Sequence, residues 1–246
     1  MTKVKIRADR ILTNFLRANL NDVNSSRSGN WIYPDFPRVE DLSDTSFPRV
    51  GITLLSDDSD MMGISDDTQW HNISIQIDVI TKKDLAFTLT VTDEALGTVA
   101  ATSNSNRMTY DFPPTTVTNI KHNTVAYGTV NIKGTDDDFT TPAADVMEVS
   151  FSTGNVNFNA TDLAGDVGEA ITTTYTVALE GKKVVEYLAQ EIIKQIRTNW
   201  RSDSDLLGIQ KLSLTNSFSV PLDEDIGIYR HTVEYQISMF NVGEGL

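Results

Sequence analysis

Residues 181–200, GKKVVEYLAQEIIKQIRTNW, form the clearest helix pattern in the chain. Their apolar residues recur at helical spacing and make one stripe about four turns long. The stripe consists of Val184, Leu188, Ile192 and Ile196, with Val185, Ala189, Ile193 and Trp200 beside them. Charged residues lie on the opposite side, and no proline or internal glycine interrupts the run. A stripe of this length must cover an apolar surface, and strands before and after it are the best partners.

Four segments with strand-like alternation flank this helix in the sequence. The early pair spans residues 47–55 and 70–80, and the later pair spans 208–220 and 227–240. Apolar residues alternate with polar ones in these segments, which is typical of strands with one buried face. One such face is predicted to hold His71, Ile73, Ile75, Ile77 and Val79, and another Leu212, Leu214, Phe218 and Val220. We therefore expect an α+β fold with a four-stranded, mostly antiparallel sheet packed by two helices.

A second helix is predicted over residues 3–20, because apolar residues recur there at helical spacing. Its apolar side is predicted to hold Val4, Ala8, Ile11, Leu12, Phe15 and Leu16. Its polar side is basic and includes Lys5, Arg10 and Arg17. Two interpretations of this side remain open. It is either a docking patch for an acidic neighbour or a solvated helix face, and charge runs more often indicate the latter.

Residues 21–46 are predicted to be a loop that contains an aromatic arm. Pro34 and Pro37 oppose a helix in this segment. The many aromatic side chains predict that the arm packs, either on the chain's own core or on a neighbouring subunit. The interface candidates are therefore Trp31, Tyr33, Phe36 and Arg38 of the arm, with Lys5, Arg10 and Arg17 of the first helix.

Residues 84–180 differ in composition from the segments around them. Threonine is frequent, the apolar stretches are short, and turn residues recur, for example at 152–155. This pattern predicts a small β-sandwich or barrel. The segment has 3 basic and 13 acidic residues, a net charge of −10. The sequence thus predicts an α+β core formed by residues 1–83 and 181–246, interrupted by an inserted β-rich domain at 84–180.

The formal net charge of −14 argues against nucleic acid or an anionic membrane as a general partner. An acidic surface suits work in high salt, and simple solubility explains it equally well. No apolar run approaches the length of a membrane span, and the first residues lack the apolar core of a signal peptide. Cysteine is absent, which removes disulfides and thiolate chemistry from consideration.

Residues suited to catalysis are few. The histidines lie in three unrelated contexts, at His71, His122 and His231. The aspartate clusters at 57–58, 66–67 and 136–138 lack the ligand spacing and central glycine of a calcium loop. No phosphate-binding loop or nucleophile elbow occurs. We expect no enzyme activity, no cofactor and no metal site.

Without residues 84–180, the predicted order is helix, loop, strand, strand, helix, strand, strand. This order resembles the tail terminator (tail completion) proteins of long-tailed phages and tailed archaeal viruses. The resemblance is carried by FPRVGI at 47–52, WHNISIQIDVITKKD at 70–84, KVVEYLAQEIIKQIRTNW at 183–200 and GIYRHTVEYQISMF at 227–240. The segment at 84–180 and the long aromatic loop depart from the family's pattern.

The resemblance implies a structural function in the virion, after assembly in the host cytoplasm. Six copies would form a ring on the last ring of the tail tube and stop its polymerisation. The other side of the ring would meet a head-completion or neck protein, and DNA would pass through without sequence-specific binding. Such a ring needs complementary shape and charge and no reactive group.

Two alternatives remain open. The first is a carbohydrate- or surface-binding module that decorates the virion and uses the threonine-rich segment at 84–180 as its reader. Exposed aromatic side chains on that segment would favour it. The second is another tail-tube or neck component.

Overall fold

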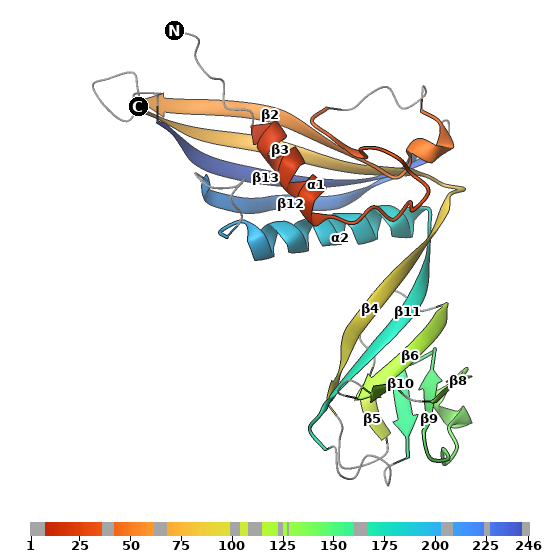
Figure 1. The fold of residues 1–246 in the computed structure, drawn as a ribbon. Coiled ribbons are helices and arrows are strands. Elements are labelled where there is room, and N and C mark those ends of the chain that lie inside the picture. The colour runs from red at the N-terminus through yellow and green to blue at the C-terminus, as the bar shows by residue number, and fades with distance from the viewer. Residues whose placement is uncertain are drawn as a thin grey trace. The chain divides into compact units, whose positions relative to one another are not determined.

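The computed structural model describes residues 8–35, 42–61, 68–98, 104–107, 115–122, 125–126, 128–159, 167–202, 209–223 and 227–242. The chain divides into two compact units (Figure 1). One consists of Met1–Phe87 with Glu180–Leu246, and the other of Thr88–Leu179. These boundaries lie close to the predicted ones at 84 and 180. Both units are rich in sheet, and the protein is mixed α+β.

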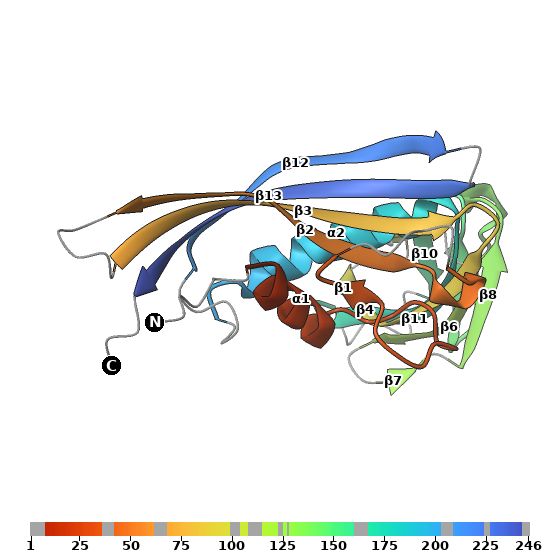
Figure 2. The same cartoon turned by 90° about the horizontal axis from the view of Figure 1, so that it is seen from above.

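Five strands form the sheet of the first unit within the described residues. Their order across the sheet is β1 (Ile32–Tyr33), β2 (Arg49–Met61), β3 (Thr68–Lys82), β13 (Ile228–Val242) and β12 (Ile209–Asp223). The four long strands run antiparallel and lie side by side in Figures 1 and 2, whereas β1 pairs with β2 in parallel. The predicted antiparallel sheet with two helices is confirmed in this coarse form. The prediction of four strands was one short, because residues 32–33 of the predicted loop add the short edge strand β1.

Helix α2 (Lys182–Asn199) covers one face of this sheet and matches the prediction for 181–200. Its stripe is buried against β3 and β13, the strands in the middle of the sheet. The strands supply a matching apolar face, with the side chains of Ile73, Ile75, Ile77, Val79, Val233, Tyr235 and Ile237. Each fully buried side chain of this size contributes about 1.5–3 kcal/mol, so this layer is the main core of the unit.

Helix α1 (Ala8–Asn19) packs against β1, β2 and α2. It buries Leu12, Phe15 and Leu16, three of the residues predicted for its apolar side. The predicted start at residue 3 lies outside the described residues. Arg10 is exposed on this helix, and Arg17 lies in its last turn.

A bulge corrects the predicted face of β12. Leu214 lies opposite Tyr235, whereas Phe218 lies opposite Thr232, and the register shifts between Leu214 and Asn216. Directly opposed residues in an antiparallel pair share a face, so Phe218 lies on the other face from Leu214. The prediction that Leu212, Leu214, Phe218 and Val220 share one face was therefore wrong.

The second unit contains two sheets within the described residues. One has the order β4 (Ala86–Thr98), β11 (Ala170–Glu180), β6 (Thr116–His122) and β7 (Val125–Ala126). The other has the order β5 (Asn104–Arg107), β10 (Asn155–Phe158), β9 (Val146–Ser150) and β8 (Thr129–Lys133). Both contribute to one apolar cluster of Leu96, Ile120, Ile171, Met147, Val149, Val156 and Phe158. Two sheets on a shared core are the arrangement of a β-sandwich.

Candidate functional site

The arm residues 31–33 pack on the chain's own sheet. Trp31 and Ile32 are buried, and the Trp31 carbonyl accepts a hydrogen bond of 2.9 Å from the Val50 amide. Of the two alternatives for the arm, this part therefore takes the first, contact with its own core. Trp31 was predicted as an interface candidate, and its burial makes it a core residue of the single chain.

Tyr33 lies between two arginines of the same unit. The guanidinium carbon of Arg49 is 4.2 Å from the centre of its ring, and that of Arg17 is 5.8 Å away. Nε and Nη2 of Arg17 also donate to the Ile32 carbonyl, at 2.9 and 2.6 Å. Arg17 thus anchors the arm to α1, which accounts for its charge without an acidic neighbour.

Of the remaining interface candidates, the structure describes only Arg10. It is exposed on α1, about two turns before Arg17. Lys5, Phe36 and Arg38 lie outside the described residues.

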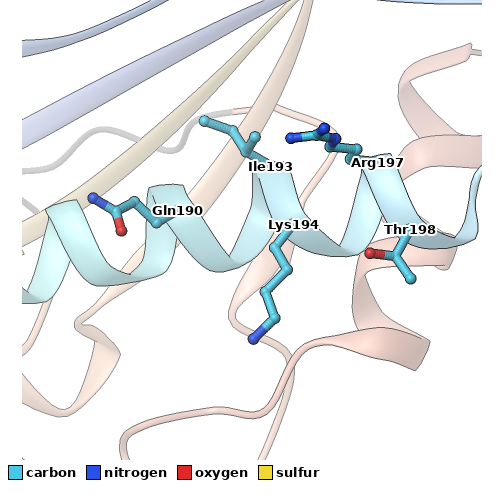
Figure 3. Close-up of a pocket in the computed structure, with 5 residues that line it drawn as sticks. All are labelled: Gln190, Ile193, Lys194, Arg197 and Thr198. Atoms are coloured by element: carbon cyan, nitrogen blue, oxygen red, sulfur yellow. The ribbon is translucent and has the colours of Figure 1, made fainter. Parts of the chain in front are cut away.

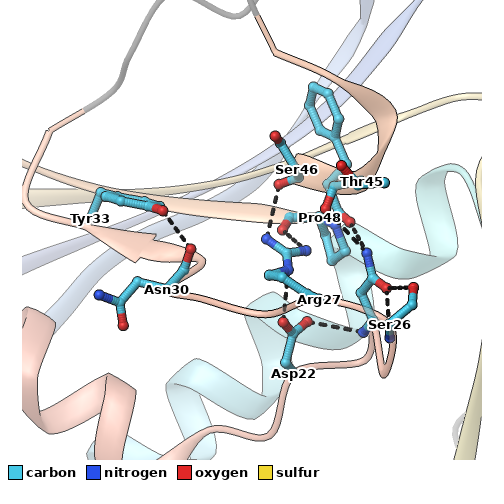
Figure 4. Close-up of polar contacts among 10 residues, drawn as sticks. Asp22, Ser26, Arg27, Asn30, Tyr33, Thr45, Ser46 and Pro48 are labelled. Carbon is cyan, nitrogen blue, oxygen red and sulfur yellow. Dashed lines mark hydrogen bonds and ion pairs between the residues drawn. The ribbon is translucent and has the colours of Figure 1, made fainter.

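A polar pocket of about 430 Å³ lies beside the arm, and we call it the arginine pocket. It is lined by residues 26–30, Tyr33, Thr45, Ser46 and Arg49. Figure 4 shows the polar contacts on this side of the unit. The short helix η2 (Asp44–Ser46) and the start of β2 form one wall, and the loop before β1 forms the other.

Arg27 holds the two walls together (Figure 4). Its Nη1 donates to the Ser46 carbonyl at 2.9 Å, and its Nη2 donates to the Pro48 carbonyl at 2.7 Å. Its Nε forms an ion pair with Asp22 Oδ2 at 2.8 Å. Burial lowers the pKa of Arg27 and raises that of Asp22, while the pairing of the two opposes both shifts. Every nitrogen of this guanidinium is therefore already engaged within the chain.

Sequence reasoning missed Arg27 and Arg49. Their partners are backbone carbonyls and an aromatic ring, and Arg27 lies about twenty residues from the carbonyls that it binds. No local motif marks such a contact. The only available signal was the number of arginines flanking a loop rich in aromatic residues and turn formers.

The two outer edges of the sheet expose apolar side chains. Among the described residues, β12 has a strand partner on one side only, and β2 has none on its outer side beyond Gly51. Leu214 and Phe218 on β12 are 46% and 41% exposed, and Leu54 and Leu55 on β2 are 36% and 53% exposed. Each group lies at a bulge in its strand, next to Asn216 in β12 and next to Ser56 in β2.

Helix α2 carries a shallow hollow of about 380 Å³ along its outer side, shown in Figure 3. It is lined by Gln190, Ile193, Lys194, Arg197 and Thr198, all from the second half of the helix. Lys194 pairs with Glu191 one turn earlier, at 3.1 Å. The hollow therefore combines one apolar side chain with polar and basic ones, and its lining includes no carboxylate.

His231 contacts two serines and no carboxylate. Its Nε2 lies 2.9 Å from Ser217 Oγ, and its Nδ1 lies 3.1 Å from Ser219 Oγ. Glu186 accepts from Ser219 at 3.3 Å. Burial lowers the pKa of His231, against the opposing charge of Glu186. A catalytic triad needs the acid to orient the histidine, and here the acid binds the serine instead.

The other histidine with a described side chain, His71, lies with its Nδ1 2.7 Å from Asp57 Oδ1. His122 lies in β6 of the other unit. Within the residues that the structure describes, no group of three or more histidine and acidic side chains is placed to hold a metal ion.

Acidic residues of the second unit serve local structure. Asp136 accepts from Thr153 and Asn155, and Asp138 accepts from the amide and hydroxyl of Thr135. These contacts fix the short helix η3 (Asp136–Asp138) and the turn before β10. Two members of the aspartate cluster at 136–138 are therefore committed to the turn that contains them.

No family model matches the chain, and no curated protein matches its sequence. Neither helix of the described residues combines the length and the apolar composition that crossing a membrane requires.

Proposed function

We propose that this chain is a structural virion subunit that closes into a ring, as tail terminator proteins do. Six copies form the ring at the head-proximal end of the tail tube. The ring ends tube polymerisation and joins the tail to a head-completion or neck protein, and DNA passes through it without sequence-specific contacts. The observation that carries the proposal is the pair of open sheet edges, each with exposed apolar side chains.

Opposite edges of one sheet favour head-to-tail assembly. If the β12 edge of one copy meets the β2 edge of the next, the contact uses two different surfaces, and repetition gives a ring when the rotation between neighbouring copies closes after six. Leu214 and Phe218 would then pack on Leu54 and Leu55 of the neighbour and remove them from water. Isolated exposed leucines are common on monomers, but apolar residues at both open edges are a complementary pair of surfaces.

Packing of side chains, more than backbone hydrogen bonds between strands, would stabilise the contact between the β12 and β2 edges. The register of β12 shifts at three places, and Pro221 lies near its end. Bulges and proline prevent a long ladder of backbone hydrogen bonds with a further strand. The β12 edge is therefore protected against unlimited addition of further strands. This protection is compatible with a ring that has a fixed number of subunits.

The carbohydrate-binding alternative has less support. It requires aromatic side chains exposed on the second unit. Among the described aromatic side chains of that unit, Phe158 and Tyr175 are buried and Phe139 and Phe151 are half-buried, so none of these is exposed. The ring is thus the function that the described surfaces favour.

The test replaces Leu214 and Phe218 with Ser together and measures the mass of the assembly by light scattering. The double variant should fold and run as a monomer, because both side chains are at least two-fifths exposed in the single chain. Ile132→Ser is the matched control, since Ile132 is equally exposed on the second unit. An unchanged mass for the double variant, or the same loss in the control, would contradict the edge contact.

A further inference from the structure

Arg49 is a buried cation for which the described residues provide no acceptor. Its side chain is 8% exposed, and its Nε is buried with no hydrogen-bond partner. Among the described residues, its guanidinium makes no ion pair or hydrogen bond, and it lies against the ring of Tyr33, 4.2 Å from the ring centre. A buried charge without a counter-charge costs free energy, which an anion would recover.

The neighbouring carboxylate of Asp22 does not serve as the counter-charge of Arg49. Asp22, the acidic residue beside the pocket, already pairs with Arg27 at 2.8 Å and accepts from the Asn24 amide at 2.9 Å. The charge of Arg49 also acts on Arg27, where it opposes protonation. Asp44, in the η2 wall, is likewise paired, with Lys82 at 2.5 Å, so both of these carboxylates are already committed.

We propose that the arginine pocket binds a carboxylate, with Arg49 as its charged ligand. The ring of Tyr33 holds the guanidinium plane in place, and a fixed planar guanidinium matches the two oxygens of a carboxylate. The hydroxyl groups of Ser28 and Thr45 line the same space and supply further donors. This inference follows from the contacts of Arg49 alone and holds whether or not the chain forms a ring.

A carboxylate fits better than a nucleic-acid phosphate. The net charge of −14 repels a polyanion, whereas a single carboxylate needs only the local excess of positive charge. Two sources can provide it: an aspartate or glutamate side chain of a second copy, or a free small carboxylate.

The first experiment measures the melting temperature of the full chain while sodium succinate replaces sodium chloride at constant ionic strength. Succinate should stabilise the wild type and should bind Arg49→Met at least about tenfold more weakly, the loss expected for a charge-assisted hydrogen bond. Arg49→Lys, which keeps the charge but loses the planar fork, should fall between them. Arg10→Met removes an exposed arginine and should respond as the wild type does. Equal responses of all four proteins would overturn the proposal.

The second experiment identifies the source through the mass of the assembly. If the carboxylate belongs to a second copy, Arg49→Met should lower the mass, and succinate should lower that of the wild type by competition. If it is free, the mass stays unchanged while succinate binding is lost in Arg49→Met. Both results support the pocket. The edge variant of Leu214 and Phe218 distinguishes the two proposals. If it loses assembly but still binds succinate, carboxylate binding by the pocket does not depend on ring formation.

Discussion

Nε of Arg230 lies 2.8 Å from Oδ1 of Asp78, although 152 residues separate the two in the sequence. The pair joins β13 to β3 on the face of the sheet opposite α2. Thr232 also donates to Asp78 Oδ1, at 2.6 Å, and Gln76 donates to its Oδ2, at 2.7 Å. The strands before and after the β-rich segment are therefore bound together as neighbours within one unit.

Asp78→Asn should destabilise the first unit by about 1–3 kcal/mol, because an amide cannot accept all these hydrogen bonds. Asp78 is buried, so water does not replace the lost contacts. The measurement is urea unfolding followed by tryptophan fluorescence, since all three tryptophans lie in the first unit. Asp44→Asn is the control, because its pair with Lys82 lies in the same unit and is largely exposed, and such pairs contribute about 0–1 kcal/mol. Equal losses of unfolding free energy in both variants would show that the Asp78 contacts stabilise the unit no more than an exposed ion pair does.

Gly181→Ala should cost more stability than Gly168→Ala. Both glycines have positive φ, 49° at Gly181 and 94° at Gly168, so alanine is strained at either. A Cβ at Gly181 would also lie 2.9 Å from Cε2 of Tyr229, whereas a Cβ at Gly168 meets nothing within 4 Å. Thermal unfolding of the two variants measures the difference, which should be about 1–3 kcal/mol, as for overpacking. A smaller loss at Gly181 than at Gly168 would refute the close approach of Tyr229.

Glu148 should make the second unit sensitive to acid. Burial alone would raise the pKa of Glu148, but hydrogen bonds from Thr140, Lys133 and Asn157 outweigh it and lower the pKa from 4.5 to about 2. Since the folded-state pKa is depressed, the ionised group stabilises the fold above pH 4.5, and this stabilisation is lost as the pH falls towards 2.

The wild type should therefore exceed Glu148→Gln in unfolding free energy by on the order of 2 kcal/mol at pH 7, and by almost nothing near pH 2. Unfolding followed by circular dichroism across this pH range measures the difference. Asp137→Asn, an exposed carboxylate in η3, should track the wild type throughout. A constant gap between wild type and Glu148→Gln would mean that Glu148 does not titrate in this window.

A variant that joins Phe87 to Glu180 through a short Gly-Ser linker should keep the first unit folded. The Gly181 amide donates to the Leu85 carbonyl at 3.3 Å, so the chain leaves and returns to this unit at neighbouring points. Leu85 packs on the cluster of Phe47, Ile80 and Ile228, and this junction retains it. The variant should stay soluble, unfold cooperatively and form the same oligomer as the full chain. An aggregated product would show that residues 88–179 are part of the core.

Sequence periodicity predicted those helices and strands whose pattern does not depend on their neighbours in the fold. The stripe of α2 and the alternation of β3 needed no knowledge of their partners. The bulge of β12 could not be predicted in this way, because it depends on which residues of β13 lie opposite. The strand β1 is two residues long and owes its existence to β2, so it carries no periodic signal.

The candidate site was predictable only in part. The aromatic arm at 31–38 was expected to pack, and residues 31–33 do so, but on the chain's own sheet. The isolated charge of Arg49 depends on the absence of acceptors for it among the described residues, which only the three-dimensional contacts reveal. The change of face at Phe218 likewise follows from the bulge and not from the strand's composition.

The proposed ring is tested most directly by the mass and symmetry of the wild-type assembly. Native mass spectrometry gives the mass, and electron microscopy of the same sample, in low and high salt, gives the symmetry. The predicted result is a closed ring of six times 27.2 kDa that is more stable in high salt. Copies of charge −14 repel each other less when the Debye length falls from about 10 Å at 0.1 M to about 3 Å at 1 M salt. A monomer at every protein and salt concentration would contradict it.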